Sequence, residues 1–420
     1  MTSRPRLIYL ASSFPYGKND TFFGPEVREL VRQGVDLLAI PVRPRGDLTT
    51  EDAAALTLRK PLLDVEIAWS ALTETLRSPR TVASALALLL RQPDPSVLLR
   101  NLVSLPKALW VAKLARGWRA DHIHAHWAGP PSTVALIASR VSGVPWSFTA
   151  HFADIAANNL LREKCGSALF VRFISRAMME LARRTAPAID ESRWVLLRLG
   201  VDVPPRPSAR NGLNRPPVLL MAARFDVEKR HGTLIDATFE LVQGGLELDV
   251  WLAGTGPLEA DVERQVIKRS LQNVVHLLGY IPNAQVLEWL ASGRVDVVVL
   301  PSDAEGVPVS LIEALAHGVP AVACDAGGVA ELLGDGCGEV VPPGESHELA
   351  AAVARVLASP ELRAERTRAG RARVEEEFAI TPVVHRLREL LGFGRKDAGS
   401  IPQADPDSRV GHDDGPHADG

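Results

Sequence analysis

The sequence predicts an α/β protein made of two doubly wound domains that face each other across a cleft. Short apolar runs alternate with helical patterns along the chain, which is typical of parallel sheets covered by helices on both faces. The alternation stops once, at a proline-rich segment spanning residues 204–217, and a new series of strands starts after it. A length of 420 residues suits two or three domains.

The first predicted domain covers residues 1–203. The expected helices include residues 24–33, ending before Gly34, and residues 131–142, ending before Gly143. The first apolar run is short and lacks a cleavage site, so we expect a strand there rather than a signal peptide. The short buried strands are expected at residues 7–12, 35–42, 122–126, 146–150, 170–174 and 194–199.

The second predicted domain covers residues 218–378 and follows the hinge at 204–217, whose prolines favour a semi-rigid spacer. A return helix is expected within residues 379–393. Residues 394–420 are rich in Asp, Gly and Pro, so we expect a disordered tail. The strands of this domain are expected at residues 218–222, 248–253, 274–278, 295–300, 321–324 and 339–341.

The composition excludes several classes of protein. A net charge of −3 gives no global field for nucleic acid. Cys165, Cys324 and Cys337 form no C-x-x-C pair, which argues against a disulfide framework or zinc site and fits a reducing compartment. The longest apolar run elsewhere, residues 83–90, is shorter than the about 20 residues that cross a bilayer. We expect a cytoplasmic protein, with peripheral contact at the inner face of the membrane left open.

The most informative segment runs from Glu305 to Pro320 and follows a predicted buried strand. It places Glu305 and Glu313 eight positions apart around the start of a helix. The backbone N–H groups of Val309, Ser310 and Leu311 are expected to lack intrahelical partners and to meet a diphosphate. A carboxylate before the helix and one in its first turn would then hold hydroxyls on either side. The spacing predicts a nucleotide sugar as ligand.

Two cations follow the first strand of the second domain. Arg224 and Lys229 lie at its carboxyl end, the edge at which α/β proteins bind ligands. They would neutralise the two phosphates of a nucleotide diphosphate. A solvated Arg/Lys pair is the alternative. Gly254 lies in a tight turn after the next strand, where a glycine alone also serves only to turn the chain.

These segments resemble glycosyltransferase family 4, whose members are retaining enzymes of the GT-B fold with two Rossmann-like domains. The resemblance covers about residues 6–392, and within the family the chain is most similar to exopolysaccharide-type members. The family's Glu-x7-Glu signature matches Glu305 and Glu313, and its Arg…Lys pair matches Arg224 and Lys229. The donor-binding residues that it implies are Gly17, Arg224, Lys229, Gly254, Leu278, Gly279, Tyr280, Gly306, Val307, Pro308, Ser310, Leu311 and Glu313.

The resemblance also implies that His151 and Glu305 are the catalytic residues, since Phe148-Thr-Ala-His151 matches the family's Phe-Thr-x-His. His126 and Asp154 are acceptor-side candidates. The run His122-Ile-His-Ala-His126 looks like metal ligands on one strand face, but the family carries a similar run and works without a metal. We therefore expect no metal and no cofactor besides the donor. Asn19-Asp20-Thr21-Phe22 is similar to a family loop that covers the donor phosphates.

The implied function is metal-independent transfer of a hexose-type sugar, with retention, from a nucleotide diphosphate sugar to a glycan or lipid-linked acceptor. This would serve polysaccharide or glycolipid assembly. A nucleotide-sugar epimerase of related fold and a catalytically silent scaffold are the alternatives. Residues 97–119 hold five cations, no acid, Trp110 and Trp118. They would form either a basic amphipathic surface for an anionic membrane or a core helix with a solvated face.

Overall fold

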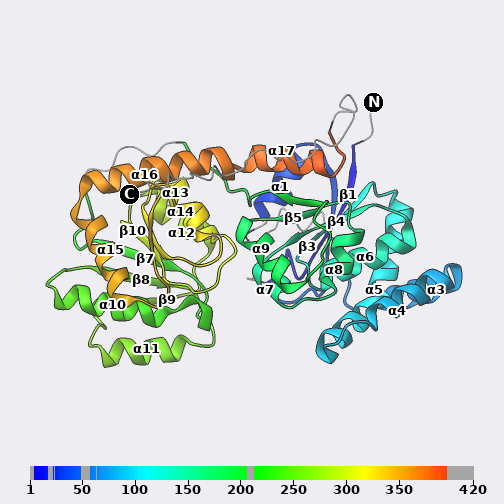
Figure 1. The fold of residues 1–420 in the computed structure, drawn as a ribbon, viewed down its shortest axis with the longest axis horizontal. Helices are drawn as coiled ribbons and strands as arrows, with labels where there is room; N and C mark the ends of the chain where they lie inside the picture. The colour runs from blue at the N-terminus through cyan, green and yellow to red at the C-terminus, as the bar shows by residue number, and fades with distance from the viewer. Residues whose placement is uncertain are drawn as a thin grey trace, which may run out of the picture.

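The computed structural model describes residues 4–17, 22, 24–48, 57–62, 64–205 and 212–394. It contains two parallel six-stranded sheets. The first sheet has the order β2-β1-β3-β4-β5-β6 and the second β12-β11-β10-β7-β8-β9. Figure 1 shows the sheets in two separate bodies, each flanked by helices. The predicted fold class is confirmed.

The strands start and end close to the predicted positions. Most of them consist mainly of apolar residues and are buried on both faces, as expected for a parallel sheet covered on both sides, while β3 alternates buried histidines with apolar residues. The first sheet comprises β1 (Arg6–Ala11), β2 (Asp36–Pro41), β3 (His122–His126), β4 (Trp146–Ala150), β5 (Val171–Phe173) and β6 (Trp194–Leu196). The second comprises β7 (Val218–Ala222), β8 (Asp249–Ala253), β9 (Val275–Gly279), β10 (Val297–Leu300), β11 (Ala321–Cys324) and β12 (Glu339–Val341).

The helices lie between these strands and cover both faces of each sheet. Those of the first half are α1 (Gly24–Arg32), α3 (Val65–Arg77), α4 (Pro79–Leu89), α5 (Pro95–Trp118), α6 (Pro130–Ser142), α7 (Phe152–Ala156), α8 (Leu161–Ser167) and α9 (Arg176–Thr185). Those of the second half are η2 (Val227–Lys229), α10 (His231–Gln243), α11 (Glu259–Lys268), α12 (Asn283–Ala291), α13 (Val309–Ala316), α14 (Val329–Leu333), α15 (Ser346–Ala358), α16 (Pro360–Arg373), η3 (Val374–Phe378) and α17 (Ile380–Leu390).

The chain passes between the two bodies twice, and the two crossings lie side by side. Val201 forms a parallel bridge with Ala379, with its N–H donating to Phe378 O at 2.8 Å. A Cβ on Gly200 would lie 2.8 Å from Ile380 Cα, so only glycine allows this approach. Residues 206–211 of the predicted hinge and 395–420 of the predicted tail lie outside the described residues, so the domain boundaries stay predictions.

The last helix, α17, returns to the first body and packs against α1. Figure 1 shows α16 and α17 running across the top of the molecule from one body to the other. Ile380, Val384 and Leu387 of α17 share a buried cluster with Val27 and Leu30 of α1. The return helix therefore belongs to the hydrophobic core of the first domain.

A carboxylate of the second body caps a helix of the first. Glu331 on α14 accepts from the N–H groups of Arg176 (3.0 Å) and Ala177 (2.9 Å) at the start of α9. Its carboxylate also pairs with Arg198 at 2.6 Å. Because orphan N–H groups and a partial positive charge mark a helix N-terminus, Glu331 ties the two bodies together.

The prediction of an amphipathic surface over residues 97–119 is wrong for two of its residues, Lys107 and Trp110. Trp110 is buried against the core, and Lys107 is fully buried. The Lys107 Nζ donates to the carbonyls of Pro41 (2.5 Å) and Lys60 (2.7 Å), and burial lowers its pKa to about 7. Pro106 lies inside the continuous helix α5. This segment is mainly a core helix, and among the described residues no helix is long and apolar enough to cross a membrane.

We predict that Glu331→Ala weakens the association of the two bodies. The variant leaves two helix N–H groups without their acceptor and removes one partner of Arg198, which keeps Glu377 and Ile174 O, and this should cost about 1–3 kcal/mol. Thermal unfolding should start earlier, and the radius of gyration from X-ray scattering should increase. The control is Glu288→Ala, which removes an exposed carboxylate of α12. Equal behaviour of the two variants would contradict the capping role.

Candidate functional site

A cavity of about 760 Å³ lies between the two sheets and is lined by residues of both. Phe22, Trp127 and His151 contribute from the first body. The second body contributes residues from the ends of β7 and β10 and the start of α13. Those predicted as site residues are Arg224, Lys229, Glu305, Gly306, Val307, Pro308 and Ser310.

The strand orders explain why the cavity lies there. In the second sheet the chain proceeds from β7 to β8 on one side and to β10 on the other. The loops after β7 and β10 therefore leave the sheet in opposite directions and open a crevice between them, the usual ligand position in such folds. Arg224 follows β7 and Glu305 follows β10, which brings residues 81 positions apart in the sequence to one place.

The loop between β10 and α13 is held by a close backbone contact. Gly328 N–H donates to Gly306 O at 2.8 Å. A Cβ on Gly327, whose φ is +56°, would lie 1.8 Å from Glu305 O, so a side chain there would displace the loop. The glycine pair thus fixes Glu305 at the cavity wall.

The N-terminus of α13 presents to the cavity backbone N–H groups that lack hydrogen-bond partners in the described part of the chain. The backbone N–H groups of Val309 and Ser310 have no hydrogen-bond partner among the described residues. Leu311 corrects the prediction: its N–H donates to Pro308 O at 3.1 Å, and its side chain is fully buried in the core. Two of the three expected donors therefore remain for an anion.

Lys229 and Glu305 form the central ion pair of the cavity. Lys229 Nζ donates to Glu305 Oε1 at 2.6 Å, and the side chains are 18% and 8% exposed. Arg224 is more exposed and pairs with Asp226 at 2.6 Å within its own loop. Opposite charges thus occupy the cavity wall at one point, with the second cation at its rim.

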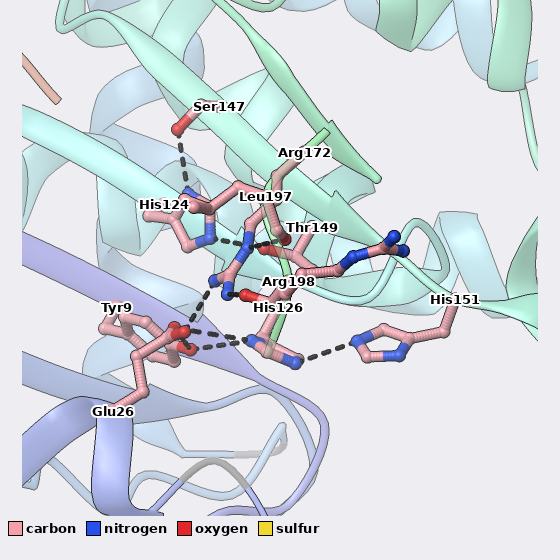
Figure 2. A network of polar contacts seen from close by, with 10 residues as sticks. All are labelled: Tyr9, Glu26, His124, His126, Ser147, Thr149, His151, Arg172, Leu197 and Arg198. Carbon is pink, nitrogen blue, oxygen red and sulfur yellow. Dashed lines mark hydrogen bonds and ion pairs between the residues drawn. The ribbon is translucent and has the colours of Figure 1, made fainter. Parts of the chain in front are cut away.

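His151 forms one end of a buried polar chain in the first body (Figure 2). Its Nε2 lies 2.9 Å from Nε2 of His126, whose Nδ1 lies 2.7 Å from the Tyr9 hydroxyl. Tyr9 donates to Glu26 at 2.9 Å, and Glu26 pairs with Arg172 at 2.5 Å. This series of hydrogen-bonded side chains extends from the cavity wall across the first sheet to α1 and β5.

The order of donors and acceptors in this series determines which nitrogen of each histidine carries a proton. Since Tyr9 O–H donates to the Glu26 carboxylate, Nδ1–H of His126 must donate to the Tyr9 oxygen. Burial lowers the pKa of His126 well below its usual value, so the ring is neutral and its Nε2 accepts from Nε2–H of His151. Burial likewise lowers the pKa of His151 to about 3. The cavity therefore faces a neutral imidazole.

His126 and Asp154 do not reach the cavity as predicted. His126 is fully buried behind His151. The Asp154 carboxylate accepts from the backbone N–H groups of Ala128 and His151, the latter at 2.8 Å, and burial raises its pKa to about 7. Sequence proximity to His151 was misleading because α7 turns this side chain back into the protein. Both residues position His151 rather than contact the cavity.

Glu313 lies away from the predicted first turn. It is the fifth residue of α13, whose first turn holds no acid. Its carboxyl accepts from Asn283 Nδ2 at 2.8 Å. Burial raises the pKa of this carboxyl to about 8, against the lowering effect of Asn283. A contact with ribose stays a prediction.

The predicted glycines have local structural reasons. Gly17 (φ +77°) has its N–H donating to Asp47 O at 2.8 Å, and Gly254 follows β8 where its N–H donates to Gly279 O at 2.8 Å. Leu278 and Gly279 end β9, and the following Tyr280 is 41% exposed. Their donor contacts stay predictions. Residues 18–21 of the predicted phosphate loop lie outside the described residues.

The histidine run on β3 is built into the core. All three rings are fully buried, and His124 contacts Ser147 (2.8 Å) and Thr149 (3.0 Å) on the neighbouring strand. His122 also contacts Ser147, at 2.8 Å. Within the described part of the chain, no group of three His, Cys, Asp or Glu side chains is placed to hold a metal.

Trp127 is a cavity residue that the sequence did not single out. Its ring centroid lies 4.3 Å from that of His151, and its Nε1 is buried without a hydrogen-bond partner in the part that the structure describes. Its φ of 91° is rare for a residue other than glycine. The adjacent histidines were a signal for the strand end, but the strained backbone that turns this ring into the cavity has no signature in the sequence.

We predict that Glu26→Gln destabilises the protein by about 3 kcal/mol, since it leaves Arg172 buried without a counter-charge. Urea denaturation measures the loss. The double variant Glu26→Gln/Arg172→Met should recover part of it because no unpaired charge remains. A wild-type midpoint in Glu26→Gln would refute the role of the pair.

We predict that Glu313→Gln gains stability over the wild type as the pH rises. The pKa of Glu313 is about 8 in the folded protein, whereas the unfolded chain ionises near its usual value of about 4.3. The wild type therefore loses stability between these values, and glutamine does not ionise. The measurement is the difference in unfolding midpoint across this range, in which groups common to both proteins cancel. A constant difference would contradict the raised pKa.

Comparisons with known proteins agree with this geometry. The chain matches the family model Glycosyltransferase Family 4 over residues 27–204 and the model Glycosyl transferases group 1 over residues 206–373. It is 32% identical over 299 residues to the putative colanic acid biosynthesis glycosyltransferase WcaL of Escherichia coli, covering 66% of this chain and 72% of that protein. It is 28% identical over 332 residues to the 2-deoxystreptamine glucosyltransferase of Streptomyces kanamyceticus, covering 69% and 84%.

Solved structures share the fold. HepE of Anabaena, determined with UDP-glucose, superposes with a TM-score of 0.69 at 18% identity, covering 92% of this chain and 99% of that one. A glycosyltransferase of Rickettsia africae gives the same TM-score at 16% identity, covering 94% and 100%. With two family models matching successive halves and a relative of this similarity, the chain belongs to glycosyltransferase family 4.

Proposed function

We propose that this chain transfers a hexose-type sugar, with retention and without a metal, from a nucleotide diphosphate sugar to an acceptor hydroxyl. The observation that carries the proposal is the placement of cations and anion-binding donors on one cavity wall. Arg224, Lys229 and the free N–H groups at the start of α13 lie on the second body, opposite His151 on the first.

The second body supplies the groups for a diphosphate leaving group. Lys229 and Arg224 offer two positive charges, and the N-terminus of α13 adds a partial positive charge with free donors. In the proposed reaction Lys229 contacts the phosphates while Glu305, its partner at 2.6 Å, turns to a sugar hydroxyl. These groups stabilise charge that develops as the leaving group departs. They also supply the charge that a divalent cation would otherwise provide.

Retention follows in the proposed mechanism from attack on the leaving-group side. The bond between the sugar C1 and the phosphate oxygen breaks, and a bond from C1 to the acceptor oxygen forms. The acceptor's proton passes to the departing phosphate. No strong enzyme base is needed, so the protein acts by positioning and by stabilising charge. His151, with its pKa lowered to about 3, adds no positive charge beside the developing sugar cation.

The acceptor is proposed to be a growing glycan or a lipid-linked sugar. The E. coli relative is named for colanic acid biosynthesis, and a 32%-identical protein of Erwinia amylovora is named for amylovoran biosynthesis. Both names support polysaccharide assembly for this chain. HepE was solved with UDP-glucose, which makes UDP-sugars the first donors to test.

The test is a panel of UDP-, GDP-, ADP- and TDP-sugars incubated with the purified protein, with and without EDTA. We expect binding of one donor, slow release of its free sugar, and no change with EDTA. After an acceptor is found, NMR of the product should show the donor's anomeric configuration. Inversion or loss of activity in EDTA would overturn those parts of the proposal. Conversion to an epimer would indicate an epimerase, and no binding a silent scaffold.

We predict that Lys229→Ala and Glu305→Ala each lower kcat/KM for transfer by about 10²-fold or more. The double variant keeps the charge balance of the pair, so it should fold normally and still be inactive. Matched controls are Lys268→Ala and Glu263→Ala, which remove exposed charges of α11. Wild-type turnover in either single cavity variant would refute the assigned site.

A further inference from the structure

Of the 14 large apolar side chains that are exposed in the described residues, seven lie on three helices of the first domain and an eighth, Leu90, directly follows one of them. We name this surface the α3–α5 apolar face. Figure 1 shows α3 and α4 on the side of the first domain that is remote from the second. The members of the face are Val65, Trp69, Leu72, Leu76, Leu86, Leu90, Leu99 and Val103.

The spacing on α3 shows that this exposure is organised. Val65, Trp69, Leu72 and Leu76 follow one another at intervals of four, three and four residues, so they form one stripe along the helix. Val65 is 83%, Trp69 61% and Leu76 73% exposed. The opposite side of α3 packs along α5 and buries Ile67. An amphipathic helix normally turns its apolar stripe inward, whereas the apolar stripe of α3 faces outward and its buried side holds Ile67, Ser70 and Glu74.

The same segments carry exposed cations for which the described residues supply no acid partner. Arg77, Arg80 and Arg91 are exposed and have no ion-pair partner among the described residues. Arg100, beside Leu99, donates to Ser96 at 3.1 Å and to no acid in the described part of the chain.

The carboxylates nearby are already engaged. Glu66 pairs with Lys60 at 2.8 Å, Glu74 is buried against Arg116, and Asp94 caps the start of α5 with a 2.7 Å bond from Ser96 N–H. The face therefore combines apolar side chains with uncompensated positive charge.

We infer that the α3–α5 apolar face binds the surface of a membrane that contains anionic lipids. Exposed leucines would enter the boundary between headgroups and acyl chains, and Trp69 suits that boundary because its ring is apolar with one polar edge. The arginines would lie at the level of the anionic headgroups. This surface shares Leu99, Arg100 and Val103 with the predicted segment 97–119, but it does not include Trp110 and Lys107 of that segment, which are buried.

The charge disfavours a second copy of the chain as the occupant. A twofold interface brings the same patch of both copies together. The arginines Arg77, Arg80 and Arg91 of both copies would then gather in one interface, and the local carboxylates are occupied. An anionic lipid surface complements both the apolar stripe and these arginines.

Co-sedimentation of the full chain with vesicles tests the inference. We expect binding to phosphatidylcholine vesicles containing about 30 mol % phosphatidylglycerol, weaker binding to phosphatidylcholine alone, and a decrease with added salt. Arg80→Ala/Arg91→Ala should weaken binding about fivefold for each arginine. Leu72→Glu/Leu76→Glu should weaken it by about tenfold or more. The matched control is Ile267→Glu, which alters a 53% exposed residue of α11 in the second domain.

Equal vesicle binding by the wild type and Leu72→Glu/Leu76→Glu would overturn the inference, as would an equal loss in Ile267→Glu. Sedimentation velocity without lipid distinguishes the other occupant: a dimer that Leu72→Glu/Leu76→Glu dissociates, with no vesicle binding, would assign the face to a second copy. Unfolding midpoints of the variants should match the wild type because all the altered side chains are exposed. No donor or acceptor is present in these measurements, so their failure and that of the proposed transfer reaction are distinguishable.

Discussion

The buried ion pair between Arg172 and Glu26 is the interaction on which the first domain and its part of the site both depend. Arg172 donates to Glu26 on α1 and to the carbonyls of Leu197 and Arg198 beyond β6, so it joins three elements around one charge. A buried charge is tolerated only with such complete pairing. Since Glu26 also accepts from Tyr9, the same pair sets the hydrogen-bond order that ends at His151. The stability of the first domain and the orientation of the His151 ring thus both depend on the ion pair between Arg172 and Glu26.

The site itself is divided between two bodies, so its geometry depends on their junction. His151 belongs to the first and the Lys229–Glu305 pair to the second. Contacts that hold them in register include Glu331 on the N-terminus of α9, the close approach of Gly200 to Ile380, and α17 on α1. These groups do not line the cavity. The distance between imidazole and ion pair therefore depends in part on groups whose sequence context shows no sign of function.

The sequence contained enough information for the strands and for one half of the site. Parallel strands buried on both faces read as short apolar runs, and Arg224 and Glu305 follow two such runs directly. Other features depend on which distant segments meet. Glu26 and Arg172 are 146 positions apart, and nothing local indicates that they pair. His126 and Asp154 were misplaced because a strand end and a short helix determine which way their side chains point. The apolar stripe of α3 could be recognised as exposed only from the structure, because the packing of α5 determines which side of α3 is covered.

The distribution of charge across the cavity matches the reaction that a glycosyltransferase performs. In the proposed reaction, Lys229, Arg224 and the start of α13 on the second body lie where the leaving diphosphate would gain negative charge. The sugar that loses this group would become positive, and the first body presents the neutral, buried His151 on the opposite cavity wall. Protonated, this ring would oppose the developing charge. Its pKa is lowered by burial, with Trp127 and Phe22 packed against the ring, and further by the positive charge of Arg172. The packing of the first domain thus supplies the low pKa of His151 that the proposed reaction requires.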